Sequence, residues 1–129
     1  MKYIYTAVFT EDNDGKVYAR VPDLDGCITT GKSLEDAIEM ITDAMSLWLV
    51  TAEDDGSEIR PATKQADIII QPGEEYSLIY ADTLKYRAQY DTRSVRKNVS
   101  LPQWMVKLAE KKGINCSKVL QDALMDVLA

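Results

Sequence analysis

An eight-residue stretch near the C-terminal end, Val95–Pro102, constrains the fold of this chain most strongly. Read as a β-strand, it places Val95, Val99 and Leu101 on one face and polar residues on the other, because successive side chains of a strand alternate. A single strand of this length is not stable by itself in water. The stretch therefore predicts pairing with the same strand of a second copy, which would form a two-stranded antiparallel ribbon.

The residues after this stretch predict two amphipathic helices. Pro102 suits the first turn of a helix, where its missing N–H is not needed, and Gly113 suits the C′ position that ends one. Asn115 is expected to cap the second helix. Apolar residues recur at helical spacing in both segments: Trp104, Met105, Leu108 and Ala109, then Val119, Leu120, Ala123, Leu124, Val127 and Leu128. Two such short helices cannot bury this much apolar surface in one copy, which again predicts a dimer.

The polar face of the predicted ribbon consists of Arg96, Asn98 and Ser100. A two-stranded ribbon fits the major groove of DNA, where arginine pairs with guanine and asparagine with adenine. We therefore interpret these three residues as base contacts. The alternative is a solvated strand face without a partner.

The order of strand, proline-led helix, glycine turn and second helix resembles the ribbon-helix-helix repressors, the group that includes Arc and MetJ. The resemblance covers residues 94–128 and rests on Asn98–Pro102 and Gly113–Ser117. It implies that the outward ribbon residues read bases and that the start of the second helix binds a phosphate through backbone amides. The residues implied in DNA binding are Arg96, Lys97, Asn98, Ser100, Asn115, Cys116 and Ser117.

Lys97 departs from the pattern of that family. It falls in the inward phase of the strand, where an apolar residue is usual. Its aliphatic stem is expected to lie on the core while its ammonium group reaches water or a phosphate.

Charge is distributed unevenly along the chain, whose net charge is −6. Residues 91–129 contain seven basic and four acidic side chains, a net charge of +3. Residues 1–90 contain eight basic and seventeen acidic side chains, a net charge of −9. A basic tail on an acidic body predicts two different partners.

The first ninety residues predict strands and one long helix. Alternating apolar and polar residues, interrupted by turn-forming residues, indicate three short strands in a meander. Ser33 is typical of a helix N-cap and precedes an apolar stripe of about four turns that would cover one face of the sheet. The predicted elements are strands over residues 3–9, 17–21 and 27–30, a helix over 33–49, a polar connection over 51–65, an apolar segment over 66–70, a strand over 76–82 that could rejoin the meander, and an exit toward the ribbon over 85–92.

Two motifs in this part resemble the HicB antitoxins. Val21–Cys27 is similar to their Val-Pro-Asp-Leu-Pro-Gly-Cys turn, with Asp25 in place of the second proline. Thr30–Ala37 is similar to their Gly-x-Ser/Thr-x-Glu-Glu-Ala helix start, with Asp36 in place of the second glutamate. Together with the ribbon-helix-helix pattern, the resemblance spans nearly the whole chain.

This resemblance implies an α+β fold with two domains. Residues 1–90 would form a partial RNase H-like β-meander plus helix, and residues 94–129 a dimeric ribbon-helix-helix module. The first domain would bind and inhibit HicA, a small basic toxin that cleaves mRNA, and the second would repress the operon of the pair. The acidic body suits such a cationic partner. The expected toxin contacts are Glu11, Asp12, Asp14, Tyr18, Asp23 and Asp25.

The remaining residues argue against catalysis. The chain has no histidine, and Cys27 and Cys116 are too far apart in sequence to suggest a metal site, so we expect two buried, reduced thiols. The acidic residues invite the idea of a two-metal nuclease on an RNase H-like fold. They lie in two turns, however, where acidic residues are common for backbone reasons. We predict no catalytic residue, no metal and no cofactor.

No apolar run approaches the length of a membrane span, and we expect a cytoplasmic protein. The predicted assembly is a homodimer through the ribbon, or a tetramer if the N-terminal domains also pair. The alternative function is a stand-alone ribbon-helix-helix regulator whose N-terminal domain senses a small ligand.

Overall fold

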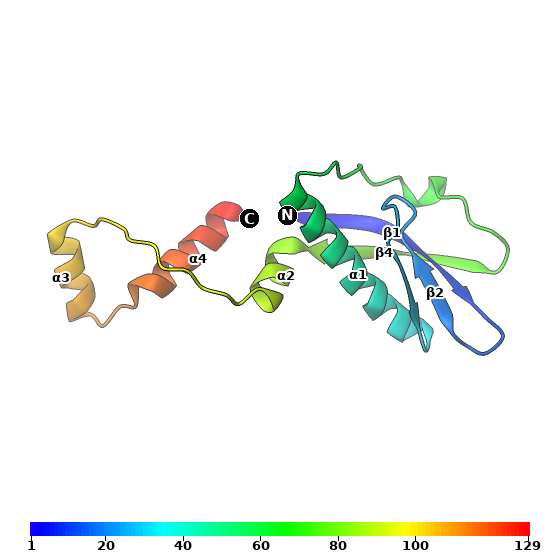
Figure 1. The fold of residues 1–129 in the computed structure, drawn as a ribbon, viewed down its shortest axis with the longest axis horizontal. Helices are drawn as coiled ribbons and strands as arrows, with labels where there is room; N and C mark the ends of the chain where they lie inside the picture. Colours follow the sequence, from blue (N-terminus) through cyan, green and yellow to red (C-terminus); the bar gives the residue numbers. More distant parts are fainter. The chain divides into compact units, whose positions relative to one another are not determined.

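The computed structural model describes residues 1–129, which form two compact units, residues 1–90 and 91–129 (Figure 1). Each unit is described by itself. The N-terminal unit contains β1 (Lys2–Glu11), β2 (Val17–Arg20), β3 (Ile28–Gly31), α1 (Leu34–Asp55), the short 3₁₀ helix η1 (Gln65–Asp67), β4 (Glu74–Asp82) and α2 (Thr83–Tyr90). The C-terminal unit contains α3 (Gln103–Lys111) and α4 (Cys116–Leu128).

The four strands form one antiparallel sheet in the order β3-β2-β1-β4. The first three strands make the predicted meander. β4 returns to pair along nearly all of β1, from Lys2 opposite Asp82 to Thr10 opposite Glu74. The expectation that the fourth strand rejoins the meander is therefore confirmed.

The core lies between one face of this sheet and α1, which crosses that face in Figure 1. Tyr5, Ala7 and Phe9 of β1 point toward the helix and are buried. The helix contributes a stripe at spacings of three and four residues, as the sequence pattern predicts: Ala37, Ile41, Met45, Leu49 and Ala52. This packing fixes which face of the sheet remains open.

The start of α1 is set by local chemistry. Ser33 Oγ accepts a hydrogen bond from the Asp36 backbone N–H at 3.1 Å, and Asp36 Oδ2 accepts one from the Lys32 N–H at 2.8 Å. The predicted N-cap is thus confirmed. β3 passes so close to this turn that a Cβ atom on Gly31 would lie 2.4 Å from the Ala37 backbone nitrogen. Only glycine fits there.

The end of α1 differs from the prediction. The expected polar connection over residues 51–65 is wrong in its first part, because the helix continues to Asp55 and ends at Gly56, whose φ is 68°. Buried Ala52 extends the apolar stripe by one turn. In the predicted apolar segment, η1 forms a single turn and Ile69 is 82% exposed.

A second difference concerns α2, where the sequence predicts an exit toward the ribbon. The Asp82 carboxylate accepts hydrogen bonds from the backbone N–H groups of Leu84 and Lys85, at 3.1 and 3.3 Å, and so starts a helix directly after β4. Thr83 is fully buried at this junction. The helix has little amphipathic pattern, and the ion pairs of Arg87 with Glu53 and Asp54 hold it to the end of α1.

The C-terminal unit consists of a stretch without regular secondary structure, residues 91–102, followed by α3 and α4. Both predicted helices are confirmed: α3 starts after Pro102, Gly113 has a φ of 65°, and Asn115 Oδ1 accepts from the Lys118 N–H at 3.1 Å. The strand over 95–102 is not formed in the single copy, which offers no partner strand, so it stays a prediction.

No residue of this unit is buried. Trp104 is 62% exposed, and Leu108, Leu120 and Leu124 are also exposed. Cys116 is exposed as well, so the expectation of two buried thiols is wrong for this residue and right for Cys27.

Candidate partner-binding surfaces

The outward side of α1 carries a line of exposed carboxylates. Glu35, Glu39 and Asp43 are spaced four residues apart and so stack along one side of the helix. We call them the acidic stripe. None of the three takes part in an ion pair, and α1 contains no lysine or arginine. Like charges at this spacing destabilise a helix, so the stripe is a candidate site for a cationic partner.

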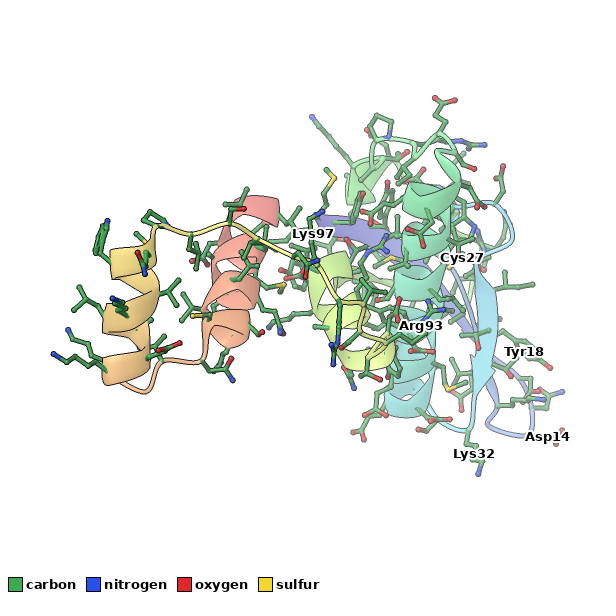
Figure 2. The ribbon with its side chains drawn as sticks, turned by 60° about the vertical axis from the view of Figure 1, so that its left-hand side comes forward. Asp14, Tyr18, Cys27, Lys32, Arg93 and Lys97 are labelled. Atoms are coloured by element: carbon green, nitrogen blue, oxygen red, sulfur yellow. The ribbon has the colours of Figure 1, made fainter.

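The acidic residues of the β1–β2 turn have different roles. Asp12 Oδ1 accepts backbone hydrogen bonds from Asp14 at 2.9 Å and from Lys16 at 3.0 Å, so this carboxylate shapes the turn. Glu11 and Asp14 are exposed. Figure 2 shows Asp14 at the tip of this hairpin and Tyr18 on the adjoining strand. The structure thus leaves Glu11, Asp14 and Tyr18 accessible.

The acidic residues of the β2–β3 turn are bound within the chain. Asp23 accepts from the Thr63 N–H at 2.8 Å and from the Thr63 hydroxyl at 2.7 Å. Asp25 Oδ2 pairs with Arg60 Nη2 at 2.9 Å, and the Asp25 carbonyl accepts from Trp48 Nε1 at 2.9 Å. These two carboxylates therefore fasten the segment after α1 to the turn.

The predicted acidic contacts are not brought together. β2 connects the two turns, so Glu11, Asp12 and Asp14 lie at one end of this strand and Asp23 and Asp25 at the other. No group of three or more aspartate, glutamate, cysteine or histidine side chains is close enough to hold a metal ion.

A partly buried charge cluster joins the end of α1 to α2, and the sequence did not reveal it. Arg87 pairs with Glu53 at 3.1 Å and with Asp54 at 2.9 Å. Glu53 also accepts from the hydroxyl of Tyr3 at 2.7 Å and from that of Thr83 at 3.1 Å. Two carboxylates at the negative end of a helix are unfavourable, and Arg87 compensates for both.

The pKa values of this cluster reflect its contacts. Burial alone would raise the pKa of Glu53, but hydrogen bonds from Tyr3, Arg87 and Thr83 hold this pKa below its ordinary value. Burial and the neighbouring Glu53 carboxylate raise the pKa of Tyr3 to about 12. At neutral pH, Glu53 is therefore a carboxylate that accepts hydrogen bonds from the neutral Tyr3 hydroxyl and from Arg87, and these contacts hold α2 to the end of α1.

The face of the sheet opposite α1 is open and largely apolar. Strand register places the outward side chains of all four strands together on it. Near its centre, Thr6 and Val8 are buried by their neighbours. Beside them, a hollow of about 450 Å³ lies over β2 and β3. Six large side chains on this surface are 40–69% exposed, and we call them the tyrosine face: Ile4, Tyr18, Ile28, Tyr76, Leu78 and Tyr80.

The predicted DNA contacts lie on the C-terminal unit and are all exposed. Arg96, Lys97, Asn98 and Ser100 belong to the irregular stretch before α3, where Figure 2 marks Lys97. The start of α4 supplies the other set: Asn115, Cys116 and Ser117. Asn115 Oδ1 already accepts from the Lys118 N–H as the helix cap, so this oxygen is not free for another contact.

Comparison with known proteins identifies the family. The family model described as a HicB-like antitoxin of bacterial toxin–antitoxin systems matches residues 5–123. The chain belongs to the HicB-like antitoxins. Among individual proteins, it is 36% identical over 70 residues to the UPF0150 protein ssr1765 of Synechocystis, a match that covers 54% of this chain and 84% of that protein.

Solved structures share the fold of this HicB-like antitoxin. A chain of a toxin–antitoxin complex from Streptococcus pneumoniae matches 98% of this chain and 99% of its own length, with a TM-score of 0.58 and 20% identity. A chain of the HicA3 and HicB3 toxin–antitoxin complex matches 62% of this chain and 99% of its own length, with a TM-score of 0.52 and 20% identity.

Among the helices of this structure, none combines the length and the apolar character that a membrane-spanning helix needs.

Proposed function

We propose that this HicB-like chain is the antitoxin of a type II HicA/HicB pair. Its N-terminal unit neutralises a basic, mRNA-cleaving HicA-like toxin by direct binding, and its C-terminal unit represses the operon of the pair. The observation that carries the proposal is the family match over residues 5–123, together with a charge of −9 on one unit and +3 on the other. A cytoplasmic location and a non-enzymatic role follow from this function.

The toxin-facing surface that we propose combines the acidic stripe with the exposed residues of the hairpin, Glu11, Asp14 and Tyr18. Unpaired surface carboxylates attract a cationic protein over several ångströms and raise its association rate. Asp12, Asp23 and Asp25 are assigned to holding the turns and not to direct contact, because their carboxylates already have partners in the chain.

Stopped-flow association of the purified chain with a HicA-like toxin tests this surface. Glu39→Lys should lower the association rate constant about tenfold at low salt, and the loss should shrink as salt screens the charges. Asp67→Lys is the matched control, because it makes the same charge change at an exposed site outside the stripe. Equal losses for both variants would mean that only net charge matters and would remove the proposed contact.

For the C-terminal unit, we propose a ribbon-helix-helix dimer. Residues 95–102 of two copies would pair as antiparallel strands, and the exposed apolar sides of α3 and α4 would pack between the copies. This arrangement supplies the burial that a single copy lacks. Arg96, Asn98 and Ser100 would then face the major groove, with Lys97 and the start of α4 at the phosphates.

Fluorescence anisotropy with a labelled duplex from upstream of the gene tests the DNA half. Arg96→Ala should cost about 1–3 kcal/mol of specific binding. Arg93→Ala is the matched control, since Arg93 lies in the same stretch but is paired with Asp91 and precedes the proposed ribbon. If neither variant loses affinity, Arg96 does not read a base. The proposed binding of the toxin would be unaffected by that result.

A stand-alone regulator that senses a small ligand is the other function the sequence leaves open. The match to the HicB-like family favours the antitoxin. We therefore propose the antitoxin alone.

A further inference from the structure

A second hollow of the N-terminal unit lies beside α1. It has a volume of about 450 Å³ and is lined by the later turns of α1, the start of β3 and the segment that follows α1. Cys27, marked in Figure 2, is buried in its wall, and Leu47 and Ile28 add aliphatic side chains that are 53% and 69% exposed. Leu47 follows Asp43 by four residues, so the hollow begins one helical turn beyond the acidic stripe.

Trp48 forms the aromatic part of this wall. Its indole N–H donates to the carbonyl of Asp25 at 2.9 Å, and its ring packs against the core. Both contacts hold the side chain in place. An indole ring attracts a cation electrostatically, because its π electrons make its face negative.

Two carboxylates of the hollow have no counter-ion in the chain. Asp55 ends α1 and Glu58 lies three residues further; both are exposed, and neither takes part in an ion pair. No lysine or arginine lines the hollow. Arg60, which lines a smaller hollow next to it, is already paired with Asp25 at 2.9 Å. The hollow therefore combines an aromatic ring, an aliphatic wall and uncompensated negative charge.

This combination suits the side chain of an arginine. A guanidinium group is planar, stacks on aromatic rings and pairs with carboxylates, while the aliphatic stem of the residue packs on apolar side chains. A lysine ammonium is more strongly hydrated and cannot stack on a ring in this way. An uncharged apolar side chain would gain nothing from the two carboxylates.

We propose that the hollow beside Trp48 is an anchor site for one arginine side chain of the basic partner of this chain. The inference rests on the proposed toxin binding and adds to it the chemical group that is held most tightly. The acidic stripe would draw the partner in and set the association rate. The anchor would set the dissociation rate, because a few well-packed aromatic and arginine contacts hold most protein complexes together.

Dissociation of the chain from a HicA-like toxin tests the anchor. The double variant Asp55→Asn, Glu58→Gln should raise the dissociation rate constant about tenfold, and so should Trp48→Leu. The matched control is Asp67→Asn, Glu75→Gln, which removes the same two charges at exposed sites outside the hollow. The control should leave the dissociation rate nearly unchanged. Circular dichroism verifies the native fold of each variant.

A hexa-arginine peptide tests the hollow without the toxin. In a Trp104→Phe background, this peptide should change the fluorescence of Trp48 and should bind more tightly than hexalysine does. The double variant Asp55→Asn, Glu58→Gln should weaken the binding of hexa-arginine more than the control pair does.

The outcomes separate this inference from the proposed function. A chain that fails to bind the toxin, but whose Trp48 responds to hexa-arginine in preference to hexalysine, would remove the proposed function and support the arginine site. Unchanged toxin dissociation in the double variant and in Trp48→Leu, both with the native fold, would overturn the anchor and leave toxin binding in place. Equal binding of the two peptides, or no response of Trp48 to hexa-arginine, would overturn it as well.

Discussion

The two units of this chain use similar helices with opposite results. In the N-terminal unit, α1 lays its apolar stripe on a sheet, and side chains such as Ile41, Met45 and Leu49 are fully buried. In the C-terminal unit, α3 and α4 have apolar sides of comparable regularity, and no side chain is buried. The first unit finds its partner surface within the chain. We propose that the second finds it in another molecule.

This difference teaches that amphipathic pattern alone does not tell where a helix packs. Helices of 9 and 13 residues are marginal in water when nothing covers them. The N-terminal unit should therefore be stable at any concentration, whereas the C-terminal unit should gain its stability on association. Trp48 lies in the first unit and Trp104 in the second, so each unit carries its own fluorescent reporter.

The largest expected effect is a loss of stability when a core side chain of the N-terminal unit is truncated, compared with an exposed one of the C-terminal unit. Leu49→Ala should destabilise the N-terminal unit by about 2–5 kcal/mol, because it leaves a cavity among buried side chains. Denaturant unfolding followed by Trp48 in a Trp104→Phe background measures this value. Leu120→Ala, at an exposed site of α4, should leave the same transition unchanged. Equal destabilisation by both substitutions would break the comparison, since it would couple the two units.

A smaller effect concerns the charge cluster. Arg87→Met should cost about 1–3 kcal/mol, because it leaves the partly buried Glu53 and its neighbour Asp54 without their counter-ion, with some screening by solvent. Arg60→Met is the control and should cost under about 1 kcal/mol, since its partner Asp25 is well exposed. Thermal unfolding of both variants, followed by Trp48, provides the measurement. A larger loss for Arg60→Met would contradict the role given to the cluster.

The same cluster predicts a pH dependence confined to the N-terminal unit. The pKa of Glu53 is lower in the folded chain than its usual value of 4.5, so its contribution to stability is present above that value. The contribution is lost as pH falls through the folded-state pKa. Unfolding free energies from neutral to acidic pH should therefore fall less steeply in Glu53→Gln than in the native sequence. Identical slopes would show that Glu53 does not carry this dependence.

The smallest expected effect is a difference in reactivity between the two thiols, Cys27 and Cys116. Burial raises the pKa of Cys27 to about 11, so this thiol should not react with a disulfide reagent in the folded chain. Cys116 is exposed at the start of α4 and should react at once. A colorimetric thiol titration before and after unfolding should therefore count one thiol and then two. Immediate reaction of both would mean that the N-terminal core opens readily.

The features that the sequence predicts correctly are local. Ser33 and Asn115 act as helix caps and Gly113 ends a helix because each role depends only on the next few residues. The apolar stripe of α1 and the meander follow from periodicity. Ser33 also belongs to the Thr30–Ala37 motif that resembles the HicB antitoxins, the family that the comparison with known proteins supports.

The features that the sequence does not reveal depend on distant residues. The last turn of α1 reads as polar, and it is held by Arg87, which lies 34 residues beyond Glu53 in sequence. In the sequence, Asp23 and Asp25 look like free acidic residues. In the structure, Asp23 accepts a hydrogen bond from Thr63, 40 residues later in the chain, and Asp25 accepts one from Arg60, 35 residues later. The tyrosine face likewise emerges only when β4 pairs with β1. In each case a tertiary contact assigns the role.

Hydrogen–deuterium exchange of the full chain over a dilution series tests the central contrast most directly. Backbone amides of β1, β4 and α1 should keep their protection at every concentration, because their core lies within one chain. Amides of α3 and α4 should lose protection as the chain is diluted below the dissociation constant of its self-association. Protection of α3 and α4 that does not change with concentration would contradict the account, since it would mean that a single copy stabilises the C-terminal unit.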